Sequence, residues 1–350
     1  MSATTYRDGT ALWRALTARV RIAAAASSRP GNELLRRFVY DRFLARVFAD
    51  LHQDSAPGSG TELGTALATP DDSGWVLKGG TAVLARVHDA RHSKDVDLLH
   101  RLGDIDDALA ALRAAASRDL GDHFRFVLGS VRPVGGRQQP GLAGYRVQVE
   151  AYCGVRRCET FSIDLVTGSV MTTAPELVRS STPLDLPGLP APTVRAYPVV
   201  DHIADKVAAT EARYSNHTPG VGPGSGSGGG SDGAVGGSSG GTSPRAESTR
   251  VRDLIDLIVL ARTQHVDGAA LHTAIAAERT HRGLPHRDTF AAPAGWATTY
   301  PKLAAATVHC HDLPQLAQAV AYVAAFLEPA MAGHVEHHDW SPTDQTWRPR

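Results

Sequence analysis

The junction between residues 75 and 81 constrains the fold of this chain more than any other part of its sequence. Residues 75–78 are a short, mostly apolar run typical of a buried strand, and residues 81–87 have the character of a helix that Thr81 is expected to cap. Gly79 and Gly80 lie between them, and a pair of glycines lets the backbone come close to a ligand. Because a helix start offers free N–H groups and a partial positive charge, the junction predicts a phosphate site.

Two aspartates, Asp95 and Asp97, occupy the next predicted strand, residues 95–99. Alternate residues of a strand point to the same side, so both carboxylates are expected to face one way. They would repel each other unless a divalent cation lay between them, and hard oxygen ligands of this kind select Mg²⁺. Asp164, in a later predicted strand, is a candidate for a third carboxylate ligand of the metal.

Each of these features has an ordinary explanation when it is taken alone. A tight turn explains a Gly-Gly pair, and a solvated strand edge explains two alternate aspartates. In the order strand, turn, helix, strand, they instead predict a phosphate cradle beside metal-binding carboxylates. That combination is the equipment for in-line attack on the α-phosphate of a nucleotide.

The remaining segments indicate an α/β (α+β) fold with a mixed sheet flanked by N- and C-terminal helices. Three runs alternate apolar and polar residues and are expected to be antiparallel strands: residues 124–131, 145–152 and 159–166. Helical periodicity covers residues 11–26, 33–51, 104–116, 201–214, 252–262, 269–279 and 313–327. The tail, residues 331–350, is expected to be frayed.

A glycine-rich segment, residues 219–244, interrupts the C-terminal helices and contains 12 of the 34 glycines. Such a composition cannot bury apolar area, so it predicts a disordered insert between two helices of one domain. The expected organisation is an N-terminal helical segment (1–60), a nucleotide-transferring core (61–200) and a C-terminal helical part (201–330) that completes the site. Without the insert, the length fits one compact domain better than two.

The composition excludes several classes of protein. With 36 basic and 36 acidic residues the chain is not a globally basic nucleic-acid coat, although a local basic patch stays open. There is no apolar run of the ~20 residues needed to span a bilayer and no signal-peptide pattern, so the cytoplasm is expected and a membrane is not. Three cysteines without metal-ligand spacing argue against a disulfide framework or a zinc site. Four lysines stand among the 36 basic residues, so each lysine is a candidate for a role that needs a compact ammonium.

Several sequence blocks together resemble a known family. They are LLRRFVYDRFLARV (34–47), WVLKGGTAVLARV (75–87), RHSKDVDLL (91–99), YPVVDHIADKVAA (197–209) and RDLIDL (252–257). These blocks resemble the AbiEii/AbiGii toxin family of nucleotidyltransferases, which includes the MenT-type toxins and belongs to the polymerase-β-like nucleotidyltransferase superfamily. The resemblance runs from about residue 34 to residue 262 and is interrupted by the glycine-rich insert.

The resemblance implies a role for each matched residue. It implies that Gly79, Gly80 and Thr81 hold the incoming nucleoside triphosphate, with Ser93 beside the metal site. It implies that Asp95 and Asp97 bind Mg²⁺, with Asp164 as the further ligand suggested above. It implies that Lys206 neutralises triphosphate charge, while Asp253 acts as a base toward the acceptor hydroxyl or orients Lys206. Asp256 lies three residues further along the same helix face and could share or take over the role of Asp253. Lys206 and Asp253 would have to converge across the insert.

The family's function, carried over by resemblance, is transfer of a nucleoside monophosphate from an NTP to an RNA, in the first place the tRNA 3′ end, which would block translation. A separately encoded antitoxin would then be the partner. Two alternatives stay open: transfer to a small molecule or a protein hydroxyl, and a nucleotide- or RNA-binding module without turnover. The candidate phosphate contacts for RNA are Arg36, Arg37, Arg42, Arg46, Arg156 and Arg157, although a solvated helix face would also explain the first four.

Overall fold

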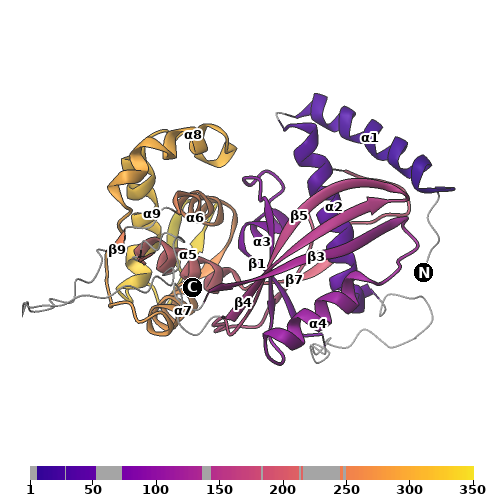
Figure 1. Ribbon diagram of the computed structural model, residues 1–350. Coiled ribbons are helices and arrows are strands. Elements are labelled where there is room, and N and C mark those ends of the chain that lie inside the picture. The colour runs from indigo at the N-terminus through magenta and orange to yellow at the C-terminus, as the bar shows by residue number, and fades with distance from the viewer. Residues whose placement is uncertain are drawn as a thin grey trace, which may run out of the picture.

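The fold is mixed α/β, built on a seven-stranded sheet in the order β3-β4-β5-β2-β1-β7-β6 (Figure 1). It is seen in a computed structural model that describes residues 6–27, 29–52, 73–135, 143–182, 184–212, 214–215, 245–246 and 250–350. The predicted mixed sheet with helices at both ends of the chain is confirmed. The glycine-rich insert, 219–244, lies outside the described residues. In the described part of the chain, no helix is both long and apolar enough to cross a membrane.

The sheet contains both parallel and antiparallel pairs. Its strands are β1 (Trp75–Lys78), β2 (Asp95–His100), β3 (Phe124–Gly135), β4 (Ala143–Cys153), β5 (Arg156–Thr167), β6 (Glu176–Arg179) and β7 (Thr193–Ala196). Strands β3, β4 and β5 pair antiparallel, as the alternating runs predicted, whereas β5 pairs parallel with β2 and β1 pairs parallel with β7. The sequence did not predict β6 and β7, because these four-residue strands lack the apolar run and the following glycine pair that marked β1.

The N-terminal helices cover one face of the sheet. They are α1 (Gly9–Ala26), α2 (Gly31–Val47), followed by the short 3-10 helix η1 (Ala49–His52), and α4 (Ile105–Ala116). The first core holds Phe38 and Phe43 of α2, Leu112 of α4 and inward residues of the strands such as Val149 and Ile163. The opposite face of β3, β4 and β5 carries the exposed and half-buried residues of the alternation, so this part of the sheet is two-sided: one face in the core and one face open.

The C-terminal helices build a second core instead of extending the first. They are α5 (Val199–Glu211), α6 (Val251–Thr263), α7 (Gly268–His281), α8 (Tyr300–Ala305) and α9 (Leu316–Met331), with the 3-10 helices η2 (Ala294–Thr298) and η3 (Val308–Cys310). Figure 1 shows them grouped at the end of the molecule away from α1 and α4. Helix α3 (Gly79–Arg86) joins the two cores, since Ala82 and Ala85 pack in the first while Val83 and Leu84 pack in the second. The described residues therefore form two cores that share α3.

The C-terminal tail is ordered, so the prediction that residues 331–350 are frayed is wrong. Strands β11 (His338–Ser341) and β12 (Thr346–Pro349) form a hairpin that adds to β10 (Val266–Asp267). Trp340 is buried, donates its Nε1–H to the Ala261 carbonyl at 2.6 Å and packs on Phe326 with ring centroids 4.7 Å apart. The polar composition of the tail predicted disorder, but two tryptophans, Trp340 and Trp347, anchor it to α9. A further short pair, β8 (Tyr214–Ser215) with β9 (Arg245–Ala246), flanks the insert.

Candidate active site

Gly79 is the residue that joins the turn to the aspartates. Its φ of +59° is left-handed, and a Cβ at this position would lie 2.0 Å from Oδ2 of Asp97. Helix α3 therefore begins against the Asp97 carboxylate, and glycine is needed both for the backbone conformation and for the space. The pairing of Gly-Gly with alternate aspartates, which the sequence suggested only by order, is a direct contact in the fold.

Thr81 and Ser93 fix the start of β2 beside this helix. The Thr81 hydroxyl donates to the backbone carbonyl of Asp95 at 2.7 Å, and the Ser93 hydroxyl donates to the same carbonyl at 3.0 Å. Both side chains are buried. The prediction that Thr81 caps the helix is wrong: α3 starts at Gly79, Lys78 occupies the N-cap position without a side-chain cap, and Thr81 sits inside the first turn. The structure thus ties Thr81 and Ser93 to the position of Asp95.

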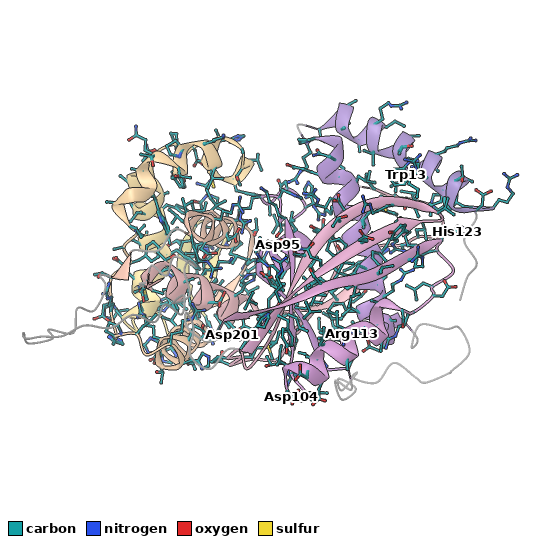
Figure 2. The ribbon with its side chains drawn as sticks, in the orientation of Figure 1. Trp13, Asp95, Asp104, Arg113, His123 and Asp201 are labelled. Carbon is teal, nitrogen blue, oxygen red and sulfur yellow. The ribbon has the colours of Figure 1, made fainter. Side chains whose placement is uncertain are left out.

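The three predicted carboxylates lie on one face of two adjacent strands. Asp95 and Asp97 alternate along β2 with buried Val96 between them, and Asp164 of β5 is the cross-strand partner of Asp97. Burial, followed by the charge of Asp164, raises the pKa of Asp97 to about 6 and also raises the pKa of Asp95. Figure 2 shows Asp95 where the sheet meets the C-terminal helices.

The fit of a divalent cation rests on this crowding of negative charge. In the described residues, no group of three or more His, Cys, Asp or Glu side chains is arranged to hold a metal ion. Asp164 instead accepts two hydrogen bonds from Arg146, both at 2.7 Å. Even so, Asp95 and Asp97 offer oxygen donors on one face, and burial, followed by repulsion from Asp164, raises the pKa of both, which a cation would counteract. The carboxylates therefore fit a divalent cation, and Asp164 as its third ligand stays a prediction.

Lys206 and Asp253 meet across the insert, as the sequence required. The Lys206 ammonium lies 2.8 Å from Oδ1 of Asp253 and 2.7 Å from Oδ2 of Asp256. All three side chains are buried between α5 and α6. Asp253 also pairs with Arg250 at 2.8 Å, and Asp256 pairs with Arg91 at 2.6 Å.

The charges in this cluster hold one another ionised. Burial opposes the charged form of Lys206, but Asp253 and Asp256 outweigh it and raise the pKa of the ammonium. Burial likewise opposes ionisation of Asp256, yet Lys206 and Arg91 lower the pKa of that carboxyl to about 2. Asp256 therefore shares with Asp253 the position beside the Lys206 ammonium. Because Arg91 belongs to the loop before β2, the cluster also ties the C-terminal helices to the aspartate strand.

Lys78 is a member of this region that the sequence left undecided. It is the cross-strand neighbour of Asp97 in the antiparallel pair of β1 and β2, so both side chains leave the same face of the sheet. Its ammonium donates to the Ser169 hydroxyl at 2.9 Å and lies 4.3 Å from the centre of the Tyr197 ring. The scarcity of lysines was the available signal, and the register of β1 against β2 is what brings Lys78 to the site.

Arg37, Arg42 and Arg46 of α2 are buried and structural, so their proposed role as phosphate contacts for RNA is wrong, and so is the alternative of a solvated face for them. The role of the half-buried Arg36 stays a prediction. Arg46 is fully buried and forms a bidentate pair with Asp122, at 2.6 and 3.0 Å. Arg37 donates to the carbonyls of His88, Leu84 and Ser181, and Arg42 donates to that of Pro190. Arg36 is half-buried in an ion pair with Glu159 at 3.1 Å. Their guanidinium groups hold the loops around α2, because burial requires each donor to find an acceptor.

The other two arginine candidates remain at the surface. Arg157 is exposed and pairs with Glu150 at 2.8 Å, while the Arg156 guanidinium lies 5.4 Å from the centre of the Trp13 ring. Both lie in or next to the turn between β4 and β5, away from the aspartates. Their role as phosphate contacts stays a prediction.

A helix start and two alternate carboxylates on a neighbouring strand, with a buried lysine cluster on the C-terminal helices, are the equipment expected of phosphoryl or nucleotidyl transfer. The chain belongs to the AbiEii family of nucleotidyltransferase toxins of type IV toxin–antitoxin systems, whose family model matches residues 64–322. The protein is thus a nucleotidyltransferase, and membership in the family implies an NTP substrate and an antitoxin partner.

Solved structures that are similar to this chain have low sequence identity. The MenT4 nucleotidyltransferase toxin from Mycobacterium tuberculosis is 16% identical, with 91% of this chain and 98% of that chain covered and a TM-score of 0.45. JHP933 from Helicobacter pylori is 14% identical, with 75% and 87% covered and a TM-score of 0.34. No curated protein matches the chain. The assignment rests on the family match.

Proposed function

We propose that this protein transfers a nucleoside monophosphate from an NTP to the 3′ hydroxyl of an RNA, with a tRNA as the acceptor, and releases pyrophosphate. The observation that supports the proposal is the contact between Gly79 and Asp97, because it sets the start of α3, which we assign to the phosphates, directly against a carboxylate that we assign to the metal. A module that only binds nucleotide would have no need for two alternate carboxylates, Asp95 and Asp97, on one face beside the helix start.

The triphosphate would lie on the first turn of α3. In this proposal the backbone N–H groups of Gly79, Gly80 and Thr81 contact phosphate oxygens, since α3 has no side-chain cap to compete for them. The hydroxyls of Thr81 and Ser93 are engaged with the Asp95 carbonyl, so we assign them the task of positioning β2.

In the proposed reaction, the acceptor oxygen forms a bond to the α-phosphorus, the bond from that phosphorus to the bridging oxygen breaks, and pyrophosphate leaves. The hydroxyl proton passes to water, because both oxygens of Asp164 are bonded to Arg146 and both oxygens of Asp253 are paired with Lys206 and Arg250. Mg²⁺ held by Asp95 and Asp97 would supply Lewis-acid stabilisation of the charge that develops on the phosphate oxygens.

The Lys206 cluster would complete the phosphate site. An ammonium is a compact point charge suited to a polyphosphate, and Lys206 is held by two carboxylates on α6. Since both oxygens of Asp253 are engaged, with Lys206 and Arg250, this pairing supports its role in orienting Lys206 in preference to its role as a base.

RNA as the acceptor and toxicity through blocked translation are carried over from the family, and the antitoxin would restrain the activity. The test is incubation of the purified protein with each of the four α-labelled NTPs, total RNA and Mg²⁺, followed by separation of RNA, protein and small molecules. Label in the tRNA fraction is the expected result, and it should disappear in Asp95→Asn, which keeps the shape of the side chain but removes its charge.

Other outcomes would replace the proposal. Label in protein or in a small molecule would identify the alternative acceptor class. Absence of label from every fraction, with folded protein, would favour a binding module. Growth arrest on expression that persists in Asp95→Asn would contradict a catalytic origin of toxicity.

A further inference from the structure

The open face of the sheet begins at the catalytic aspartates and continues outward over three strands. Along β4, the side chains of Val147, Val149 and Ala151 are buried in the core, while Arg146 on the other face is exposed. The same alternation holds on β5, where Phe161 and Ile163 are buried and Asp164 faces outward. This face is therefore continuous with Asp95 and Asp97 and is not covered by α1, α2 or α4.

A row of charged residues crosses this face at the level of Asp97. Arg132 of β3 is the cross-strand partner of Arg146, Arg146 is the partner of Asp164, and Asp164 is the partner of Asp97. At ~4.8 Å between strands, three steps separate Arg132 from Asp97 by roughly 14 Å. Stacked nucleotides advance ~3.4 Å each, so about four of them span the row.

A second row lies further along the same strands and contains an aromatic ring. Arg125 of β3, Tyr152 of β4 and Arg157 of β5 are cross-strand neighbours. The Arg125 guanidinium lies 4.4 Å from the centre of the Tyr152 ring. Six residues of β4 separate this row from Arg146, a distance of about 20 Å.

The charge balance of the face is positive toward β3. Its two acidic residues outside β2 are already paired: Asp164 with Arg146, and Glu150 with both Arg157 and the Tyr152 hydroxyl. Arg125 and Arg132 are exposed and have no carboxylate partner in the ranges that the structure describes. These two arginines, one of which stacks on Tyr152, suit a polyanion with flat bases.

We infer that this open face, defined as Arg125, Arg132, Arg146, Tyr152 and Arg157, binds the single-stranded 3′ end of the acceptor RNA and leads it to Asp95 and Asp97. The inference rests on the proposed function and adds the route of the acceptor. Phosphates contact the arginines, and at least one base stacks on the Arg125–Tyr152 pair. The NTP enters from the other side of the aspartates, at α3 and the Lys206 cluster.

The test measures binding without turnover. A fluorescent single-stranded RNA oligonucleotide is titrated into Asp95→Asn protein and followed by anisotropy at 50 and 200 mM salt. The double variant Arg125→Ala/Arg132→Ala is compared with Arg113→Ala, which removes an exposed arginine from α4 on the covered side of the sheet (Figure 2). Removing two phosphate contacts should make the loss of affinity between these salt concentrations about sevenfold smaller. Arg113→Ala should match the parent.

Stacking is tested separately from charge. Tyr152→Ala should weaken RNA binding by about 5- to 100-fold without changing its salt dependence, whereas Tyr152→Phe should keep most of the affinity. In the active protein, the open-face variants should raise the KM for RNA and leave the KM for NTP unchanged. Thermal melting of each variant checks that the fold is intact.

The outcomes separate this inference from the proposed function. If RNA is labelled by the wild type and the open-face variants bind it like Arg113→Ala, the docking surface is wrong and the function stands. If the wild type neither binds nor labels RNA, the RNA acceptor itself is wrong, and the inference falls with it. If the variants bind RNA normally but lose the antitoxin, the face belongs to a protein partner and the inference is refuted.

Discussion

Replacing Gly79 by alanine should lower both the activity and the free energy of unfolding, because the added carbon conflicts with the backbone conformation and with a neighbouring side chain. The residue has a φ of +59°, which an L side chain rarely adopts, and the new Cβ would lie 2.0 Å from Oδ2 of Asp97. To reach the 3.4 Å of ordinary contact, the carboxylate would have to retreat by about 1.4 Å. Gly79→Ala therefore moves the Asp97 carboxylate, which we assign to metal binding, while position 97 keeps its aspartate.

This geometry sets the expected losses of stability and of activity. The left-handed backbone costs about 1–2 kcal/mol for a residue with a side chain. Overpacking adds a further 1–3 kcal/mol, so the free energy of unfolding should fall by roughly 2–5 kcal/mol. A displacement of about 1 Å at a reacting centre lowers the rate by ~100-fold, and we expect nucleotidyl transfer to fall by at least that factor.

A matched control separates backbone strain from the clash. Gly283 has a φ of +62°, and, its two chain neighbours apart, no atom of the described residues lies within 4 Å of where its Cβ would be. Gly283→Ala should therefore lose only the 1–2 kcal/mol of backbone strain and keep full activity. In an Asp97→Ala background the nearest contact of the new Cβ is the Asp97 Cβ position at 2.9 Å, so Gly79→Ala should cost less there.

Chemical denaturation and transfer assays on these four variants decide the matter. Equal stability of Gly79→Ala and Gly283→Ala, together with retained activity, would refute the claim that the turn and the aspartate are in contact. So would a cost of Gly79→Ala that is the same with and without the Asp97 carboxylate.

Three further predictions concern the surrounding fold. Arg46→Met leaves Asp122 buried without its bidentate partner and should lower the free energy of unfolding by about 3–5 kcal/mol in denaturant titrations. The RNA affinity per folded molecule should not change. Weaker RNA binding at full stability would instead support Arg46 as a phosphate contact. Trp340→Ala should lower the free energy of unfolding by about 3–5 kcal/mol in the same titrations, because it empties a buried site. The control Asp344→Ala, at an exposed position, should change it little. If Trp340→Ala left stability unchanged, the tail would not anchor the second core. Burial, followed by the charge of Lys206, lowers the pKa of His202 to about 3, so this imidazole is neutral in the folded state. In the unfolded chain the same imidazole takes up a proton near pH 6.5. The free energy of unfolding should therefore decrease as the pH falls below 6.5, by about 2–3 kcal/mol at pH 4.5. His202→Leu should remove this part of the dependence of stability on pH. An unchanged pH dependence would show that His202 is not buried as a neutral group.

Much of the fold and most of the candidate site could be predicted from local pattern. The strand ending at Lys78, the alternate aspartates of β2 and the antiparallel β3, β4 and β5 all follow from period and turn residues. The order of the motifs identified the turn and the aspartates as one site. Local pattern failed where burial depends on distant residues. The arginines of α2 alternate with apolar residues as on a solvated face, yet acceptors as far along the chain as Asp122 and Pro190 bury them.

The sequence by itself determined which residue types the chemistry needs and their order along the chain, because glycine conformation and strand alternation are properties of neighbouring residues. Only the tertiary structure decided which of them meet. The contact of Gly79 with Asp97, the register that sets Lys78 and Asp164 on either side of Asp97, and the closing of Lys206 onto both Asp253 and Asp256 are long-range pairings. Their physical cause is the packing of α5 and α6 on α3 and the pairing of β2 with β1 and β5, which no local window of sequence contains.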